Sequence, residues 1–288
     1  MPSSRVFFCV ILMITISIGS TEAHALSGYN DDPSNGCTTK EATANADRLK
    51  EDSTQGISKN NTWLNGLNVH GIILSQLQYP KDSTSTRMPV PSKIIELQVE
   101  GSRFRARKED GTWATDEELV GALLVVGGSD GSKVTYRIDS IEKASYGKAG
   151  EMFLYTFSIK DPATDNWINF CRPDSQGMQR GFPLSGYWDE KGYHIRSADQ
   201  YSITCTSGVI AKCIKQGYVP WKTTRDGKSL WEYHQACTRM LRADYCGNGK
   251  FHTREGTKIE LWDREGIQLE SSEPRLTFEA AWSPDGAV

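Results

Sequence analysis

The chain opens with a predominantly apolar run from Val6 to Ile18, which follows the single positive charge of Arg5. Gly19 and Ser20 follow the run, and the small-residue pattern Ala23-His24-Ala25 comes shortly after them. A cationic start, a short apolar core and a small-residue cleavage site are the three parts of a secretory signal peptide. The run is too short to cross a bilayer, which takes roughly 20 apolar residues. We therefore predict that residues 1–25 are a cleaved signal peptide, with a short buried helix as the alternative.

The next stretch, residues 26–62, is rich in Asn, Asp, Ser, Thr and Lys and has scarcely any large apolar side chain. Such a composition cannot bury enough apolar surface to fold by itself. We predict that this stretch is a disordered tether, which carries Cys37.

Residues 63–165 consist of short alternating or apolar runs separated by turn residues, a pattern typical of antiparallel strands. Asp110-Gly111 and the segment Gly127 to Gly131 supply residues that tolerate the positive φ angles of hairpin turns. We expect a β-rich half, either a curled antiparallel sheet or a small barrel. The expected strands cover residues 67–77, 93–99, 104–107, 119–126, 133–141, 152–159 and, just beyond this half, 167–170.

The pattern changes from residue 166 onward, where helical periodicity joins the strands. A hairpin is predicted over 186–193 and a strand over 201–205. Ser207 is a candidate N-cap for a short helix that Gly217 would end. The apolar stripe of this helix comprises Val209, Ile210, Cys213 and Ile214.

A second helix is predicted to open with Ser229-Leu230-Trp231-Glu232, a capping box in which serine and glutamate bond each other's backbone N–H groups. Gly247 or Gly249 would end it. Its expected core face comprises Leu230, Tyr233, Cys237, Met240 and Leu241. A further hairpin is expected from 258–262 and 267–270.

These elements together predict an α+β fold, with a β-rich N-terminal half and C-terminal disulfide-linked helices and hairpins. The regions 63–165 and 166–288 form either two units or one continuous domain. The chain stops directly after an apparent strand, which leaves a truncated C-terminus open as an alternative. No later stretch of the chain is long and apolar enough to span a membrane.

The composition limits the classes of partner that this chain is expected to bind. The hydrophobic and charged fractions, 38% and 24%, are ordinary for a folded globular protein. The net charge is −3, and the 33 basic and 36 acidic residues are mixed along the chain. Since nucleic-acid binding needs a basic patch or stripe, no nucleic-acid partner is expected.

Of the seven cysteines, Cys9 lies in the predicted signal peptide, and six would remain after cleavage. In an oxidising compartment such cysteines are expected to form disulfides. Bridged cysteines need Cα atoms about 4.4 to 6.8 Å apart, which excludes neighbours separated by most of a helix. The six are Cys37, Cys171, Cys205, Cys213, Cys237 and Cys246.

Cys213 and Cys237 lie on the buried stripes of the two predicted helices, so we prefer a bridge between them. Cys171 and Cys205 both end predicted strands and could join across a sheet. Cys246 is left to pair with Cys37 or with a cysteine absent from this chain. Structural zinc is the alternative, but its ligands usually stand two to four residues apart, which these do not. We therefore predict no metal site and no cofactor.

Three segments of the second half carry a family resemblance: Cys205 to Cys213, Gly217 to Trp221, and His234 to Cys246. The last ends in Ala243-Asp244-Tyr245-Cys246, and the chain resembles the bacterial ADYC domain family, which is named for that tetrapeptide. The resemblance extends over most of the chain after the signal peptide. It implies an exported bacterial protein, periplasmic or secreted, but no catalytic residue, because the family has no established activity.

Two functions remain open. The first is a binding or structural module of the cell envelope or extracellular space, in which tryptophans and tyrosines would line a groove for envelope glycan or protein. Core packing is the competing explanation for those aromatic residues. The second is a cysteine-dependent hydrolase of envelope peptides or glycans, in which Cys205 ahead of a helix N-terminus would be the nucleophile. His252 and Asp263 would complete that site, which we consider less favoured because a disulfide explains Cys205.

His234 lies one turn before Cys237, and Asp244 lies near the predicted end of the same helix. The two could form a His/Asp pair. We prefer the alternative, in which each side chain hydrogen-bonds buried backbone groups, with Asp244 accepting N–H groups of the turn into Cys246.

Overall fold

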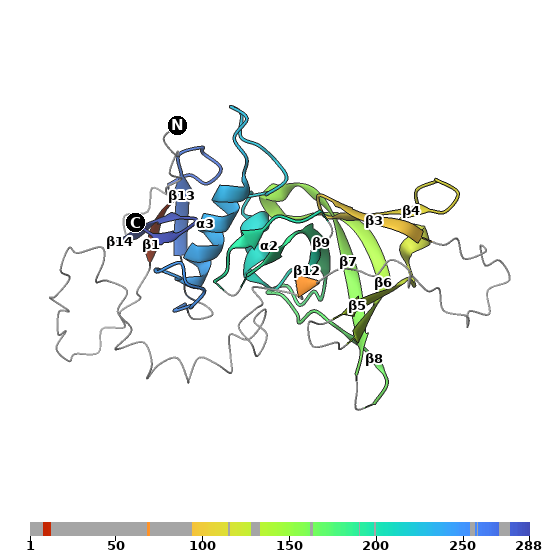
Figure 1. Ribbon diagram of the computed structural model, residues 1–288. Coiled ribbons are helices and arrows are strands. Elements are labelled where there is room, and N and C mark those ends of the chain that lie inside the picture. The colour runs from red at the N-terminus through yellow and green to blue at the C-terminus, as the bar shows by residue number, and fades with distance from the viewer. Residues whose placement is uncertain are drawn as a thin grey trace.

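The computed structural model describes residues 8–12, 68–69, 94–114, 116–127, 133–161, 164–189, 191–198, 200–253, 257, 259–270 and 277–288. The predicted tether over 26–62 and its Cys37 lie outside these residues. The described chain is mostly β, so helices contribute less than the predicted α+β class suggests. A large sheet lies at one end of the molecule and a small sheet at the other, with two α-helices between them (Figure 1).

The large sheet has seven antiparallel strands in the order β2-β12-β9-β7-β6-β5, with β8 also paired to β7. A curled antiparallel sheet was predicted for residues 63–165, and such a sheet forms. It also takes in β8, β9 and β12 from residues 167–205, so the predicted N-terminal layout is confirmed only in part. The strand bounds are β2 (Asn68–Val69), β5 (Leu123–Gly127), β6 (Lys133–Ser145), β7 (Glu151–Lys160), β8 (Trp167–Asn169), β9 (Gly181–Ser185) and β12 (Tyr201–Cys205).

The alternation of inward and outward side chains explains how the two longest strands, β6 and β7, pair with each other. Tyr136 and Ile138 of β6, and Tyr155 and Phe157 of β7, are at most 1% exposed and belong to the larger hydrophobic core. Antiparallel strands that bury one face place every second side chain in the core. The pair has one irregularity, a register shift between Ile138 and Ser140, and such bulges increase the local twist of a sheet.

Strand β9 was not predicted, and Pro183 is the reason. Proline has no N–H to donate to a ladder and is confined to strand positions without a partner on that side. β9 pairs with β12 along its whole length but with β7 only where Tyr155 faces Gly181. Pro183 therefore lies where one side of β9 is no longer paired.

A separate hairpin of β3 (Ile94–Glu100) and β4 (Arg103–Lys108) packs against the large sheet. The Phe104 N–H donates to the Tyr155 hydroxyl at 2.9 Å, and the Phe153 N–H donates to the Ser102 hydroxyl at 2.9 Å. The buried Phe104 ring also meets the Tyr155 ring edge to face. These contacts attach the hairpin to β7.

Two 3-10 turns, η2 (Glu117–Leu119) and η3 (Gly147–Ala149), connect strands of this half. A two-stranded hairpin of β10 (Tyr187–Trp188) and β11 (His194–Ile195) follows β9, where a hairpin was predicted.

The short predicted helix is α2 (Val209–Lys215), which begins after Gly208 rather than after a Ser207 cap. Gly217 follows its end at φ +100°, as predicted. Ile210, Ala211 and Ile214 of α2 belong to the larger core, whereas Cys213 belongs to a second core built around the next helix. α2 therefore contributes to both cores.

The second helix is α3 (Trp231–Arg242), and its predicted capping box does not form. The helix begins one residue later than the box requires, after Leu230. The Ser229 hydroxyl accepts only the Trp231 N–H, at 3.3 Å, while Ser229 itself bridges to Thr223.

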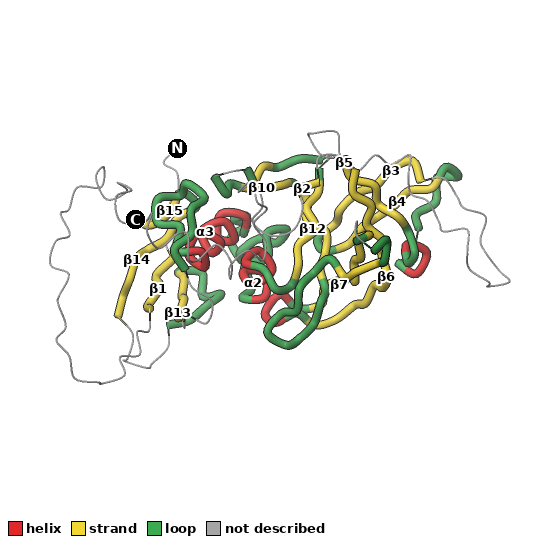
Figure 2. The backbone as a smooth tube through the Cα atoms, turned by 90° about the horizontal axis from the view of Figure 1, so that it is seen from below, coloured by secondary structure: helices red, strands yellow, loops and turns green. Residues whose placement is uncertain are grey.

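The small sheet has the order β13-β1-β14-β15, built from β1 (Phe8–Leu12), β13 (Ile259–Asp263), β14 (Thr277–Ser283) and β15 (Gly286–Ala287). It lies beside α3 (Figure 2). The predicted hairpin of 258–262 with 267–270 is wrong in its second strand. The turn after Asp263 forms, but β13 pairs with β1 instead. β1 lies within the predicted signal peptide.

Candidate functional site

The residues of the motif Ala243-Asp244-Tyr245-Cys246 lie where α3 ends. Ala243 is in the left-handed region, with φ 50° and ψ 44°. Its N–H donates to the Met240 carbonyl, and the Asp244 N–H donates to the Arg239 carbonyl, both at 2.9 Å. This pair of bonds is the Schellman arrangement, in which the left-handed position is usually glycine. The predicted stops at Gly247 and Gly249 are therefore wrong, because the helix ends at an alanine.

Asp244 is fully buried, and its carboxylate joins the helix end to the following loop. It accepts the N–H groups of Asn248 at 3.1 Å and Gly249 at 3.0 Å. It also accepts a hydrogen bond from the Arg239 guanidinium. The prediction that Asp244 bonds backbone N–H groups of this turn is confirmed.

Arg239, which sequence reasoning missed, is the partner that makes this carboxylate stable in the interior. Both side chains of the ion pair are 1% exposed. The same guanidinium donates to the Pro284 carbonyl at 3.0 Å and to the Lys191 carbonyl, and it lies 4.4 Å from the centroid of the Tyr193 ring. Buried charges need a partner and further hydrogen bonds. Arg239 therefore holds together the β10–β11 turn, the motif and the C-terminal turn.

Tyr245 faces the small sheet. The Tyr245 ring lies 5.2 Å from that of Trp282, and its hydroxyl donates to Glu279. Burial and this carboxylate raise the pKa of Tyr245 above its usual range. Cys246 is oxidised to a disulfide. Cys37, a partner considered above, lies outside the described residues.

Aromatic rings surround the first turns of α3. The His194 and Trp231 rings stack with centroids 3.7 Å apart, and Trp188 lies 4.8 Å from His194. His234 lies 6.0 Å from Trp231 and 6.1 Å from Trp188. We call these four residues the ring cluster.

Both histidines of the ring cluster are held neutral. His234 Nε2 donates to the Ile210 carbonyl at 3.1 Å, and His194 Nε2 donates to the Ser185 carbonyl at 2.8 Å. Burial lowers the pKa of His234 to about 3 and that of His194 to about 4. His234 therefore bonds a buried backbone group, as preferred above, while Asp244 pairs with Arg239 and not with His234.

The two described disulfides are Cys171–Cys205 and Cys213–Cys237, with Cα atoms 5.4 Å and 5.9 Å apart. They are the pairs that the sequence analysis preferred. The second joins α2 to α3 inside the second core.

The residues of the alternative hydrolase site serve three separate purposes. The sulfur of Cys205 is bonded to Cys171 and is not a thiol. The buried Asp263 accepts the Tyr218 hydroxyl at 2.8 Å and three backbone N–H groups of its own turn. His252 lies beside Tyr245, with ring centroids 6.1 Å apart. In this oxidised structure Cys205 cannot act as a nucleophile.

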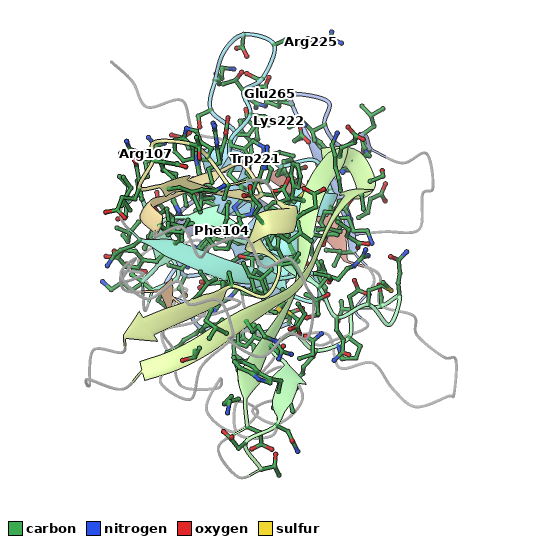
Figure 3. The ribbon with its side chains drawn as sticks, turned by 90° about the vertical axis from the view of Figure 1, so that its right-hand side faces the viewer. Phe104, Arg107, Trp221, Lys222, Arg225 and Glu265 are labelled. Carbon is green, nitrogen blue, oxygen red and sulfur yellow. A yellow bond between two sulfur atoms is a disulfide. The ribbon has the colours of Figure 1, made fainter. Side chains whose placement is uncertain are left out.

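A row of arginines and aromatic rings lies on the outer side of the β3–β4 hairpin. Arg105 lies over Trp113, 4.5 Å from the ring centroid, and Arg103 lies over Phe153, at 4.7 Å. Arg107 extends from the same side of β4, whereas Phe104 points into the core (Figure 3). All these outer side chains are half-buried. We call Arg103, Arg105, Arg107, Trp113 and Phe153 the hairpin face, of which Phe153 is supplied by β7 and also packs against the larger core.

The charges of the hairpin face are balanced. Arg103 pairs with Asp116 at 2.9 Å, Arg105 with Glu100 at 2.9 Å and Arg107 with Glu96 at 2.6 Å. The surface therefore presents donors and acceptors between aromatic rings without an uncompensated row of cations.

The described tryptophans divide between core and surface. Trp188 and Trp282 are 1% exposed, which agrees with core packing, whereas Trp113, Trp167, Trp221, Trp231 and Trp262 are half-buried. Trp63 lies outside the described residues. Trp221 covers the β3–β4 turn, where a Cβ on Gly101 would come within 3.2 Å of the indole nitrogen.

A family model for the ADYC domain matches residues 116–288. The chain belongs to the ADYC family. The ADYC match begins at η2 and includes both helices, the ring cluster and the motif at the end of α3. It leaves out the β3–β4 hairpin, so most of the hairpin face lies outside the ADYC domain. The search of curated proteins found no match, and neither did the search of solved structures.

Two further properties of this ADYC protein hold for the described residues alone. No group of three or more His, Cys, Asp and Glu side chains there is arranged to hold a metal ion. No helix among them has the length and apolar character to cross a membrane.

Proposed function

We propose that this ADYC protein is an exported binding module of the cell envelope or extracellular space, periplasmic or secreted, which binds glycan through the hairpin face. The observation that carries the proposal is the Arg105–Trp113 stack, flanked by the Arg103–Phe153 stack. A half-exposed indole offers a flat apolar surface, and the ion pairs beside it offer donors and acceptors. Sugars, which carry apolar ring faces and many hydroxyl groups, match that combination.

Charge balance favours a neutral sugar over a polyanion. Each arginine of the hairpin face already has a carboxylate partner. An anionic polymer would have to displace Asp116, Glu100 and Glu96 or remain close to them. Neutral hydroxyl groups can instead bond to the outer atoms of the existing pairs.

Oxidised cysteines support export. Cys171, Cys205, Cys213, Cys237 and Cys246 are all in disulfides. Such bonds persist in oxidising compartments and are rare in the cytosol. A hydrolase that uses Cys205 would require this cysteine in reduced form, and alkylation of the native protein by iodoacetamide would detect it.

Retention of the purified protein on insoluble peptidoglycan tests the binding role. The variant Trp113→Ala should lose at least tenfold in retention, because it removes the ring under Arg105. Trp167→Ala is the matched control, since Arg137 lies 4.4 Å from the Trp167 ring in a similar stack, at the β8 end of the sheet. Equal retention of both variants and of the unaltered protein would contradict the proposal.

A further inference from the structure

The small sheet contains one strand that export would remove. β1 pairs with β13 over five positions, from Phe8 opposite Asp263 to Leu12 opposite Ile259. It also pairs with β14, from Phe8 opposite Trp282 to Leu12 opposite Thr277. Both pairings are antiparallel, so β13 and β14 run parallel to each other. We call the position between them, which β1 occupies, the strand gap.

Cleavage after residue 25, which is part of the proposed function, takes β1 out of the strand gap. β13 and β14 would then each present a row of backbone N–H and C=O groups without partners. An unpaired strand edge is a template for another strand. Here two such edges would face each other at about twice the strand spacing, roughly 9.6 Å.

The two walls of the strand gap have separate attachments to the rest of the molecule. β13 ends at Asp263, which accepts the Tyr218 hydroxyl and the N–H groups of its turn. β14 carries the buried Trp282 next to Tyr245, and it leads into Pro284, whose carbonyl accepts from Arg239. None of these contacts involves β1. Direct pairing of β13 with β14 would need a shift of about one strand spacing, which these contacts oppose.

The floor of the strand gap is apolar. Leu261 of β13 and Trp282 of β14 are 8% and 1% exposed and belong to the second core, together with Ala236 and Met240 of α3. The small sheet lies directly beside α3 in both views (Figures 1 and 2). A strand that enters the gap therefore gains backbone hydrogen bonds on both edges and apolar contact on one face.

We propose that the strand gap of the exported protein accepts an extended apolar segment of a different polypeptide, which completes the small sheet by strand addition. The segment runs antiparallel to β13 and β14 and is at least five residues long, like β1. Within the described chain the other strands are already paired, in the large sheet, the β3–β4 hairpin or the β10–β11 hairpin. The described strands of a second copy are paired in the same way, and we therefore assign the segment to another protein.

The test uses oxidised protein that lacks residues 1–25 and a synthetic peptide of residues 5–14 as the probe. The labelled peptide should bind saturably, and the variant peptide Val10→Pro should bind at least tenfold more weakly, because proline removes a ladder donor. Cysteines report the register, since Cys9 lies opposite Ala281 and Val10 lies opposite Ala280. Opposed residues of antiparallel strands project on the same face, within the range of a disulfide. With oxidised glutathione supplied as the oxidant, Ala281→Cys should thus form a mixed disulfide with Cys9 of the peptide at least tenfold faster than Ala280→Cys.

Four results would overturn the inference. One is the absence of peptide binding while the amides of β13 and β14 resist hydrogen exchange. Others are equal cross-linking by the two cysteine variants and a concentration-dependent dimer that protects both strands. The fourth is an exported protein that retains residues 1–25, as read by N-terminal sequencing. Peptidoglycan retention through Trp113 is measured separately. Failure of peptide binding in the strand gap can therefore be distinguished from failure of glycan binding by the hairpin face.

Discussion

The two sheets of this protein are assembled in different ways. In the large sheet, β5, β6 and β7 follow one another in sequence and pair as neighbours. In the small sheet, β13 and β14 border a strand that begins at Phe8, more than two hundred residues away. Local hairpins fix the register of the first. The second depends on side chains that reach distant turns. Arg239 of α3 bonds the carbonyls of Lys191 and Pro284, and Tyr218, which follows α2, bonds Asp263.

Loss of the Asp244 carboxylate should have the largest effect, and it should affect the small-sheet half. Asp244→Ala leaves the Arg239 guanidinium without its partner in the interior and leaves two backbone N–H groups unbonded. Breaking a buried ion pair costs about 3–5 kcal/mol, and the free energy of unfolding in urea should fall by that amount. Asp226→Ala, at an exposed ion pair with Lys228, is the control and should leave unfolding unchanged. A loss below ~1 kcal/mol for Asp244→Ala would contradict the role assigned to this pair.

Removal of a disulfide should come next, and the two disulfides should differ in kind. Each closes a loop of similar size, with separations of 24 and 34 residues, so each double serine variant should lose about 3–4 kcal/mol. Cys213→Ser with Cys237→Ser should also split thermal unfolding into two transitions, because this bond joins α2 to α3. Cys171→Ser with Cys205→Ser should keep one transition at lower temperature. Calorimetry distinguishes these outcomes. A single transition in both double variants would contradict the role assigned to the bond between α2 and α3.

Acid should weaken the ring cluster between the two halves. The pKa values of His234 and His194 fall to about 3 and about 4 on folding, so the unfolded chain binds protons first. Stability is complete above the unfolded pKa of about 6.5 and is lost as the pH falls from there toward the folded values. At pH 5 each histidine should cost about 2 kcal/mol. His234→Gln, which keeps an N–H donor but does not titrate, should reduce the loss between pH 7.5 and pH 5 by about that amount. Urea unfolding at the two pH values measures this loss in the free energy of unfolding. If His234→Gln loses as much as the unaltered protein, His234 is not the group responsible.

The smallest expected effect concerns the last turn of α3. Ala243 adopts φ 50°, where a Cβ costs about 1–2 kcal/mol. Ala243→Gly removes that cost but makes the unfolded chain more flexible, so a net gain of roughly 0.5 kcal/mol is expected. Ala236→Gly, in the middle of the same helix, should instead destabilise the protein. Parallel thermal melts compare the two, and a destabilised Ala243→Gly would show that the Cβ is needed there.

Sequence reasoning succeeded where structure is local. The predicted strands 133–141, 152–159 and 201–205 correspond to β6, β7 and β12, because alternation and turn residues lie within each segment. It failed where a contact depends on residues that are distant in the sequence. Arg239 lies in the last turn of α3, and nothing nearby in the sequence indicates that it would donate to the carbonyls of Lys191 and Pro284.

The same limit applies to the candidate site. The spacing of Cys205, His252 and Asp263 allowed a reactive constellation, whereas the three side chains bond to Cys171, lie beside Tyr245 and accept from Tyr218 respectively. The arginine–aromatic stacks could not be predicted from the sequence either. Alternation along β4 indicates which arginines face outward, but not that Trp113 returns to lie beneath one of them.

The bond between α2 and α3 also determines how the molecule would respond to proteolysis. The exposed connection between these helices includes Arg225 and Lys228, both basic residues that trypsin recognises. A cut there leaves Cys213 on one fragment and Cys237 on the other, still linked through sulfur. The clipped protein would migrate as an intact chain until a reductant separates it into two pieces.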